Sequence, residues 1–399
     1  MTPWLSVVGI GEDGLAGLSQ AALRLVEDAE ILIGGERHLA MVPPDGRERI
    51  AWPSPLSVLV ERIATLRGHR IAVLATGDPM HFGIGTTLAR HVSAAEMTVI
   101  PGISAFSLAA ARLGWPLDRT AMLTLHGRPI DSLALHVHPG ARLLILAHDR
   151  TSPAAVAAWL TARGFGASRM AALAHMGGAR EARMEGRADG WSEEVPDFHT
   201  LAVDCVAGPG AAWHPRSAGL PDDAFRHDGK ITKREARALA LAKLAPHPGA
   251  RLWDVGAGCG SIAIEWMRAA DRAEAIALEP RADRRALAAL NAAHLGVPGL
   301  RIVDGAAPEA LAGLDEPDAV FLGGGIARET IAAVCRALPS GGRLVAHAVT
   351  LESEAELLAA RAGHGGDLVR LSVARAEAVG PFTGWRPAMP VTQWAWQKP

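Results

Sequence analysis

The stretch VVGIGEDGLAGLS, residues 7–19, follows a short apolar run near the start of the 399-residue chain. Its glycines Gly9, Gly11 and Gly14 match the G-x-G-x-x-G pattern of dinucleotide-binding folds. That pattern needs a ribose-binding acid at the end of the next strand, but the next apolar segment ends in two glycines, residues 34–35. The stretch therefore predicts a ligand-binding loop after a strand and argues against a nicotinamide-dependent reductase.

Two further loops of the first half also follow predicted strands. They are TGDPMHFGIG, residues 76–85, and IPGISAFS, residues 100–107. Because the carboxyl ends of parallel strands meet at one sheet edge, we expect all three loops to gather there around a ligand. Asp78 can either contact that ligand or only shape its own turn. The residues predicted to bind it are Gly9, Gly11, Gly77, Asp78, Pro79, Pro101, Gly102, Ile103 and Ser104.

A second glycine loop, RLWDVGAGCGSIAIEW at residues 251–266, ends one predicted strand and opens one predicted helix. Its G-x-G-x-G spacing after Asp254 is typical of S-adenosylmethionine enzymes, where a carboxylate favours the cationic methionine amine. Glu279 ends the next predicted strand, where a carboxylate can accept hydrogen bonds from both ribose hydroxyls. The alternative is that the glycines only turn the chain and Glu279 is an exposed strand end.

Three smaller features complete the predicted cofactor site of the second half. Thr232 begins a T-x-x-E capping box, so its side chain can cap a helix, face the cofactor, or do both. No acid follows Gly305, and backbone amides around Ala306 are expected to hold the adenine in preference to Asp304. Cys259 is expected only to fill the loop, because methyl transfer from a sulfonium is direct. The predicted cofactor residues are Thr232, Asp254, Gly256, Ala257, Gly258, Cys259, Gly260, Glu279, Gly305 and Ala306.

The segment DAVFLGGG, residues 318–325, bears on the type of substrate. Enzymes that methylate exocyclic nitrogens often carry an Asn/Asp-Pro-Pro-aromatic tetrad at this point. Three glycines argue against a nucleobase amine and favour close approach of a flat substrate or of a neighbouring segment of the chain itself. An electron-rich enamine carbon needs orientation more than a base, so this feature favours carbon methylation.

Short β-rich runs alternate with helical periods in both halves, which predicts two unlike α/β domains with mainly parallel sheets. The Pro- and Gly-rich segment 207–229 is predicted to be a linker between domains at 1–206 and 230–399. Strands are expected at 5–8, 31–33, 70–74, 97–100, 121–125, 142–146, 201–206, 251–255, 275–278, 301–303, 319–322 and 343–349, with a terminal pair of strands after them. Helices are expected at 18–27, 55–67, 85–91, 105–113 and 153–163, and another begins at Thr232.

Composition predicts a soluble globular protein. Hydrophobic residues make up 49% and charged residues 21%, and a formal net charge of -2 argues against a nucleic-acid partner. Cys205, Cys259 and Cys335 are widely spaced and the histidines show no ligand spacing, so neither a disulfide framework nor a metal is expected. No apolar run approaches 18 residues and no signal-like start is visible, so we expect a cytoplasmic protein without a membrane partner.

The segments VVGIGEDG, GDPMHFG and PGIS together resemble the three ligand loops of the tetrapyrrole (corrin/porphyrin) methyltransferases. ILIGGERHL, residues 31–39, looks like a cobalamin-pathway member of that family. GKITKREARALALAKL, DVGAGCGS, ALEP and DAVFLGGG are similar to its usual decarboxylating partner. The resemblance spans nearly the whole chain except the linker. It implies a tetrapyrrole-methylase-like α/β domain fused to a Rossmann-like methyltransferase domain with a doubly wound sheet.

This resemblance implies one S-adenosylmethionine site per domain and a precorrin-6B-type substrate. It also implies methylation at carbons 5 and 15 with loss of the ring C acetate carboxyl as CO2, giving precorrin-8 in cobalamin biosynthesis. The first domain is linked to carbon 5, and the second to carbon 15 and decarboxylation. Family relatives form dimers and tetramers, so a homo-oligomer is expected. The arginines predicted to meet the substrate carboxylates are Arg37, Arg128, Arg234, Arg328 and Arg386.

Two rival functions stay open, while the catalytic residues are not identified. A non-catalytic tetrapyrrole carrier would bind the substrate without consuming S-adenosylmethionine. Alternatively, the C-terminal half acts on a protein or another small molecule, and the N-terminal half only holds the substrate. Peptide methylation by the isolated C-terminal half, without activity on corrinoid precursors, would favour the second rival.

Overall fold

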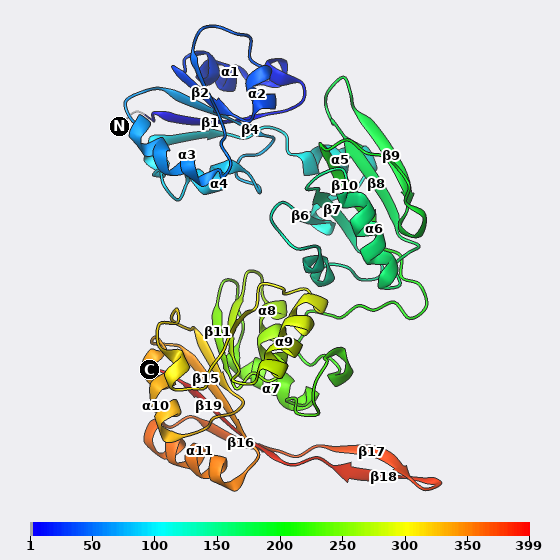
Figure 1. The fold of residues 1–399 in the computed structure, drawn as a ribbon, viewed down its shortest axis with the longest axis vertical. Coiled ribbons are helices and arrows are strands. Elements are labelled where there is room, and N and C mark those ends of the chain that lie inside the picture. Colours follow the sequence, from blue (N-terminus) through cyan, green and yellow to red (C-terminus); the bar gives the residue numbers. More distant parts are fainter. Residues whose placement is uncertain (1–2) are drawn as a thin grey trace. The chain divides into compact units, whose positions relative to one another are not determined.

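The computed structural model describes residues 3–399, which form two compact units (Figure 1). Unit 1 comprises the chain up to Ile130 together with His138–Ala212. Unit 2 comprises Asp131–Val137 and Trp213–Pro399. The predicted domain limits at 206 and 230 fall near this division without coinciding with it.

Part of the predicted linker, residues 207–229, packs on unit 2. Leu220 is 1% exposed and belongs to the core of that unit. The backbone N–H groups of Gly219 and Leu220 donate to the buried carboxylate of Glu265 at 2.6 and 2.9 Å. Arg237, which is fully buried, donates to the same carboxylate at 2.6 Å. This buried, multiply hydrogen-bonded ion pair fixes where the segment joins unit 2, which its composition alone does not indicate.

The first sheet of unit 1 has the strand order β3-β2-β4-β1-β5, and its pairs are parallel. Its strands are β1 (Leu5–Ile10), β2 (Ile31–Gly34), β3 (Glu48–Ala51), β4 (Ile71–Thr76) and β5 (Met97–Ile100). The helices between them are α1 (Gln20–Glu27), α2 (Glu36–Ala40), α3 (Ser57–Arg62) and α4 (Ile84–Leu88). Val7 and Val8 lie in different apolar clusters, so both faces of the sheet are covered, as parallel sheets require.

The second sheet of unit 1 has the order β6-β7-β10-β8-β9, and of these pairs only β6 with β7 is parallel. The expectation of mainly parallel sheets is therefore wrong for this sheet. Short connections without a crossover helix join β8 to β9 and β9 to β10, and such connections suit antiparallel neighbours. The elements are β6 (Ala121–Thr124), β7 (Arg142–Leu146), β8 (Arg169–Ala174), β9 (Ala182–Arg187), β10 (His199–Asp204), α5 (Ala105–Leu113) and α6 (Ser152–Ala162).

Unit 2 contains a seven-stranded sheet with the order β13-β12-β11-β14-β15-β19-β16. The first five strands are parallel, whereas β19 runs antiparallel to both of its neighbours. Leu252 and Trp253 belong to opposite apolar clusters, one with α7 to α9 and the other with α10 and α11, which is the doubly wound arrangement expected. The elements are β11 (Arg251–Val255), β12 (Glu274–Leu278), β13 (Arg301–Val303), β14 (Ala319–Leu322), β15 (Arg343–Ala348), β16 (Asp367–Leu371), β19 (Val391–Gln397), α7 (Arg234–Leu244), α8 (Ser261–Ala269), α9 (Ala282–His294), α10 (Arg328–Ala337) and α11 (Leu351–His364).

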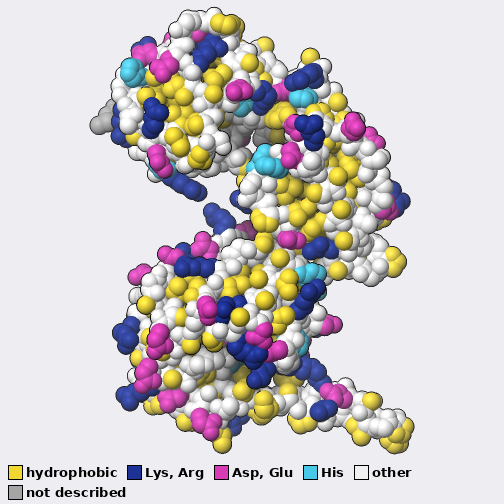
Figure 2. Space-filling model, in the orientation of Figure 1, with side chains coloured by type: hydrophobic (Ala, Val, Ile, Leu, Met, Phe, Trp, Pro, Cys, Tyr) yellow, Lys and Arg dark blue, Asp and Glu magenta, His cyan; other side chains and the backbone are white. Residues whose placement is uncertain are grey.

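The chain end of unit 2 is more elaborate than the expected pair of strands. β17 (Ala374–Val379) and β18 (Phe382–Pro387) form an antiparallel hairpin that projects from the sheet (Figure 1). Hydrophobic side chains gather near its tip (Figure 2), where Phe382 is 76% and Trp385 is 77% exposed. Within residues 3–399, no helix is long and apolar enough to cross a membrane.

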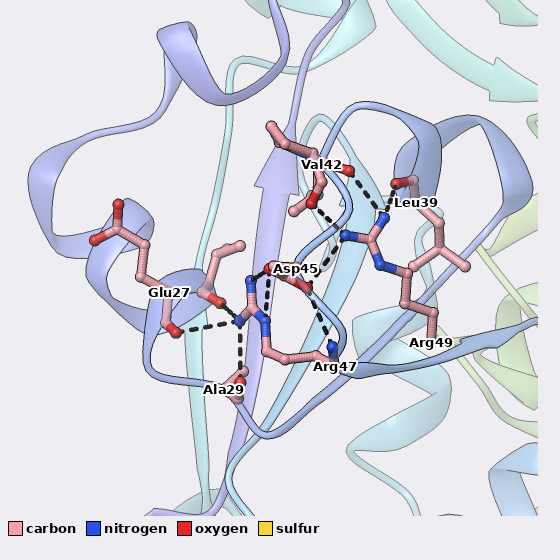
Figure 3. A network of polar contacts seen from close by, with 9 residues as sticks. Glu27, Ala29, Leu39, Val42, Asp45, Arg47 and Arg49 are labelled. Atoms are coloured by element: carbon pink, nitrogen blue, oxygen red, sulfur yellow. Dashed lines mark hydrogen bonds and ion pairs between the residues drawn. The ribbon is translucent and has the colours of Figure 1, made fainter.

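Two arginines of the β3 region satisfy backbone carbonyls at the ends of α1 and α2 (Figure 3). Arg47 donates to the carbonyls of Glu27 and Ala29 at 3.2 and 3.0 Å, and Asp45 accepts from its Nε at 2.8 Å. Arg49 donates in the same way to the carbonyl of Leu39, near the end of α2, and to that of Val42, just beyond it. Helix C-termini leave carbonyls without intrahelical partners. Cationic side chains that reach these carbonyls also interact favourably with the negative end of the helix dipole.

We expect Arg47→Ala to loosen the end of α1. The side chain is mostly buried, and its loss leaves at least two carbonyls without a donor, which costs about 1–2 kcal/mol of local stability. Hydrogen exchange of α1 amides in the full chain should accelerate roughly 5- to 30-fold. The control is Arg119→Ala, because Arg119 is 83% exposed and only 3.9 Å from Asp118. Equal protection of α1 in both variants would contradict this role.

Candidate functional site

Three loops of unit 1 meet at the carboxyl edge of its first sheet. β1 lies between β4 and β5 in parallel register, so loops 9–14, 76–85 and 100–107 leave the sheet at the same edge. The N–H of Gly77 donates to the last carbonyl of β1 at 3.2 Å, and the N–H of Gly102 donates to the Gly77 carbonyl at 3.0 Å. The loops therefore gather as the sequence predicts.

Glycine is required where these loops touch. A Cβ atom on Gly9 would lie 1.9 Å from the Gly77 carbonyl oxygen and 2.2 Å from the Gly102 nitrogen. Gly77 has a φ of +57°, in the left-handed region that favours glycine. The three backbones therefore approach so closely that no side chain fits between them.

A cavity of about 390 Å³ opens beside these loops, a size typical of small-molecule sites. Asp78 uses its carboxylate to accept the Met80 N–H at 2.8 Å, so it shapes the turn that it belongs to. Ser104 likewise accepts the Ser107 N–H at 3.1 Å and caps α5. Of the predicted residues, Gly11, Gly77, Asp78, Ile103, Ser104 and Arg37 line the cavity. Gly9, Pro79, Pro101 and Gly102 belong to the same loops without being among the described lining residues.

Charged side chains that the sequence did not single out line the same cavity. Glu12, inside the first loop, is 7% exposed and bonds Arg37 through one oxygen. Its other oxygen lies 2.9 Å from Nδ1 of His175. Arg37 also donates to Thr76 at 3.0 Å and lies 4.0 Å from the Phe198 ring centroid. One predicted arginine therefore reaches the site, but with a carboxylate partner already in place.

His38 is the most strongly perturbed group of this cavity. Burial, and secondarily the charge of Arg37, lowers its pKa to about 4. Its Nδ1 is buried without a hydrogen-bond partner. His38 therefore stays neutral at physiological pH beside Arg37.

The other predicted arginines do not converge on one point. Arg128 is exposed and lies 5.5 Å from the ring centroid of Phe82, a cavity-lining residue. Arg234 and Arg328 are exposed at the first positions of α7 and α10. Arg386 pairs with a glutamate across the β17–β18 hairpin at 3.1 Å.

In unit 2 the second glycine loop joins β11 to α8. Gly256, Gly258 and Gly260 have φ values of +71°, +58° and +80°, so each occupies the region that favours glycine. A Cβ atom on Gly256 would lie 2.8 Å from the Gly324 nitrogen. The three glycines after β14 therefore allow the chain's own neighbouring segment to approach, one of the two uses expected for them.

Two buried carboxylates flank this loop. Asp254 is 1% exposed and accepts the Ala263 N–H at 3.0 Å. Burial, with a smaller contribution from the charge of Glu279, raises the pKa of Asp254 to about 7. Glu279 is 3% exposed and accepts the N–H groups of Gly258 and Arg281 at 2.9 and 3.1 Å. Glu279 is therefore a buried anchor of the loop and not an exposed strand end.

The predicted capping box at Thr232 is wrong. α7 begins at Arg234, and the preceding Lys233 occupies the N-cap position without a side-chain cap. The Thr232 carbonyl accepts a hydrogen bond from Arg237, and Glu235 pairs with Arg375 at 2.6 Å instead of reaching back. The Glu235 carboxylate is thus paired with Arg375 and not with the backbone N–H of Thr232, which is the contact that a capping box needs.

The remaining predicted residues of unit 2 have clear surroundings. Arg285 holds Asp304 through two contacts of 2.8 Å, which favours the backbone around Gly305 and Ala306 as the adenine contact. Cys259 is 3% exposed, and burial raises its pKa to about 11, so the thiolate is disfavoured. Within residues 3–399, no three His, Cys, Asp or Glu side chains are grouped to hold a metal ion.

Comparisons with known proteins match both units. The tetrapyrrole (corrin/porphyrin) methylase family model matches residues 5–190, and that of the precorrin methyltransferase domain matches residues 223–398. A precorrin-6Y C(5,15)-methyltransferase [decarboxylating] of Sinorhizobium sp is 48% identical over 401 residues, which cover 100% of this chain and 97% of the relative.

Two shorter relatives each match about two fifths of this chain. A cobalt-precorrin-7 C(5)-methyltransferase of Salmonella typhimurium is 36% identical over 41% of this chain and 80% of its own length. A probable cobalt-precorrin-6B C(15)-methyltransferase (decarboxylating) of Sulfurisphaera tokodaii is 34% identical over 40% of this chain and 87% of its own length. The two activities thus also occur on separate proteins.

Proposed function

The chain belongs to the family of decarboxylating precorrin-6Y C(5,15)-methyltransferases, and from that membership we propose a separate cofactor site and a separate methyl transfer for each unit. The enzyme depends on S-adenosylmethionine and methylates a precorrin at carbons 5 and 15, with decarboxylation. Unit 1 serves carbon 5 in this proposal, whereas unit 2 serves carbon 15 and the decarboxylation.

One observation carries the assignment of two sites. Each unit has its own glycine loop at the carboxyl edge of a parallel sheet, and at Gly9 and Gly256 a side chain would collide with a neighbouring loop. Such edges are where open α/β sheets bind their ligands. The presence of such a sheet edge in each unit therefore favours the binding of two cofactor molecules per chain.

The residues of unit 2 fit the proposed cofactor. Among the described contacts Asp254 accepts one backbone hydrogen bond and has no ion pair, and its raised pKa reflects a buried charge without a cation. A cationic methionine amine would supply that cation. Glu279 keeps the loop in place through Gly258 and has oxygen lone pairs left for ribose hydroxyls.

When bound, S-adenosylmethionine supplies an electrophilic methyl group to the substrate carbon. The chain's own task is to hold that carbon in line and to exclude water, which can account for several kcal/mol of the barrier. Substrate carboxylates are expected to meet guanidinium groups, with exposed Arg128 near the unit 1 cavity and exposed Arg234 and Arg328 at helix starts of unit 2. Arg37 lines the unit 1 cavity but is only partly exposed and is already paired with Glu12, so it is a weaker candidate. Arg386 is a weaker candidate because it is paired on the hairpin.

The direct test is product analysis with the full chain. Precorrin-6B and S-adenosylmethionine carrying a labelled methyl group should give a product with two labelled methyl groups, at carbons 5 and 15, and one carboxyl group fewer. A product with both methyl groups at other atoms, or methylation of an added peptide in preference to the precorrin, would contradict the proposal.

The ionisation of Asp254 predicts a pH dependence for unit 2. Its folded-state pKa of about 7 lies above the ordinary 3.8. The carboxyl is therefore neutral in most molecules at pH 6 and charged in most molecules at pH 8. If the charged form binds the cofactor amine, the affinity for S-adenosylhomocysteine should rise about tenfold from pH 6 to pH 8. Calorimetry on a Gly9→Ala variant, in which the unit 1 site is blocked, measures this. In a further Asp254→Asn variant the rise should vanish, and an unchanged rise would assign it to another group.

A homo-oligomer and a cytoplasmic location belong to the proposal as well. Exposed Val379, Phe382 and Trp385 lie together on the hairpin and support association with a second copy, because contiguous exposed apolar patches mark interaction surfaces. Native mass spectrometry that finds only monomers would refute the oligomer.

A further inference from the structure

Glu12 and His175 form a largely buried pair in the cavity of unit 1. Glu12 belongs to the first glycine loop after β1, whereas His175 directly follows β8 in the second sheet. Their side chains are 7% and 12% exposed, and Nδ1 of His175 lies 2.9 Å from the Glu12 carboxylate. Both residues line the cavity beside the three loops.

The loop after β8 is built closely onto Glu12. A Cβ atom on Gly178 would lie 2.7 Å from Cβ of Glu12, so glycine is required there for the approach. His175 itself has a φ of +49°, a conformation that histidine seldom adopts. Among residues 3–399 four non-glycine residues have positive φ, and two of them, Phe82 and His175, line this one cavity. Strained backbone of this kind gathers at functional sites.

The pair fixes which nitrogen of the imidazole is basic. A carboxylate that accepts from Nδ1–H leaves the lone pair on Nε2, the arrangement that orients a histidine for proton transfer. We propose that His175 accepts, through Nε2, the proton that the precorrin loses on methylation. This inference rests on the proposed function of unit 1. Glu12 is the positioning residue of this pair.

The proton transfer completes the balance of the reaction. The π electrons of the ring enamine form the new C–CH3 bond, and the S–CH3 bond breaks with its electron pair remaining on sulfur. The tetrapyrrole then carries a positive charge, which it loses when a ring N–H proton moves to His175. Electrons and atoms balance without any further reactant.

Three charged side chains lie around His175. Glu12 faces it from the first loop, Arg37 reaches Glu12 from α2, and Arg180 lies 3.4 Å from Nδ1. Glu12 therefore places a negative charge next to the imidazole, and the two guanidinium groups lie beside that carboxylate.

His175→Asn tests the base, since asparagine accepts positive φ better than most residues and cannot take up the proton. In the full chain the kcat for carbon-5 methylation should fall about 100-fold, with KM and S-adenosylhomocysteine affinity unchanged. Carbon-15 methylation in the same incubation is the internal reference. The matched control is His69→Asn, because His69 makes the same Nδ1 contact to Glu30 at 3.0 Å but is 58% exposed and outside the cavity.

Two further variants separate proton transfer from packing. His175→Gly suits the backbone and leaves space, so added imidazole should restore carbon-5 methylation. Glu12→Gln should lower kcat about tenfold with KM unchanged, because no carboxylate then accepts from Nδ1–H and keeps the lone pair on Nε2. Wild-type kcat and pH profile in His175→Asn, or a His175→Gly variant that imidazole does not rescue, would overturn the inference. Failure of the wild-type chain to methylate carbon 5 would instead overturn the proposed function.

Discussion

Gly258→Arg should abolish methylation at carbon 15 and the accompanying decarboxylation. Gly258 has a φ of +58°, and a Cβ atom there meets nothing closer than the Lys230 carbonyl at 3.8 Å, so a side chain would extend into the proposed cofactor site. We expect affinity for S-adenosylhomocysteine in unit 2 to fall at least 100-fold, which corresponds to about 2.8 kcal/mol. Labelled methyl groups at each carbon, counted by mass analysis, provide the measurement.

The control for this substitution is Gly249→Arg. Gly249 has a φ of +78° with open space around its Cβ position, and it precedes β11 whereas Gly258 follows that strand. It therefore carries the same backbone strain and the same added charge at the opposite end of the strand. If both variants lose carbon-15 methylation equally, the effect is one of folding and the site assignment loses its support.

Gly9→Ala should abolish methylation at carbon 5. The added methyl group would lie 1.9 Å from the Gly77 carbonyl oxygen, so the loops must separate and the cavity beside them must change shape. Forced overpacking of this kind costs about 1–3 kcal/mol, and we expect unit 1 to lose that much stability together with its cofactor affinity. Gly190→Ala is the control, because a Cβ atom there meets nothing within 4 Å. Normal carbon-5 methylation by Gly9→Ala would contradict the assignment of the site.

Mixing the two inactive variants distinguishes independent sites from a shared one. The Gly258→Arg chain retains an intact unit 1, and the Gly9→Ala chain retains an intact unit 2. An equimolar mixture should therefore form the doubly methylated, decarboxylated product, whichever carbon is methylated first. A mixture that remains unable to do so would show that both transfers require one intact chain.

Much of the fold follows from short-range sequence patterns. Each predicted strand that precedes a loop motif, such as 97–100 and 251–255, overlaps an observed strand, because buried parallel strands are short apolar runs. The antiparallel second sheet of unit 1 does not follow. β8 is a buried apolar run that is indistinguishable from a parallel strand, and β9 (ARMEGR) is a polar edge strand without a hydrophobic pattern.

Some residues of the candidate sites can likewise be predicted from the sequence, whereas others cannot. Glycine spacing and strand-end acids locate Gly9, Gly256, Asp254 and Glu279, because these roles depend on residues close in sequence. The Glu12–His175 pair joins positions 163 residues apart, so only the folded chain reveals it. At Thr232 a local pattern predicts the wrong structure. The T-x-x-E pattern predicts a capping box, but α7 begins at Arg234 and Glu235 pairs with Arg375, which is distant in the sequence.

Titration of S-adenosylhomocysteine into the intact full-length chain tests the central claim of two cofactor sites most directly. Calorimetry should give two molecules bound per chain, reduced to one by Gly258→Arg and to one by Gly9→Ala. A stoichiometry of one for the unmodified chain would contradict the account, and the variant that removes this single event would identify the unit that binds the cofactor.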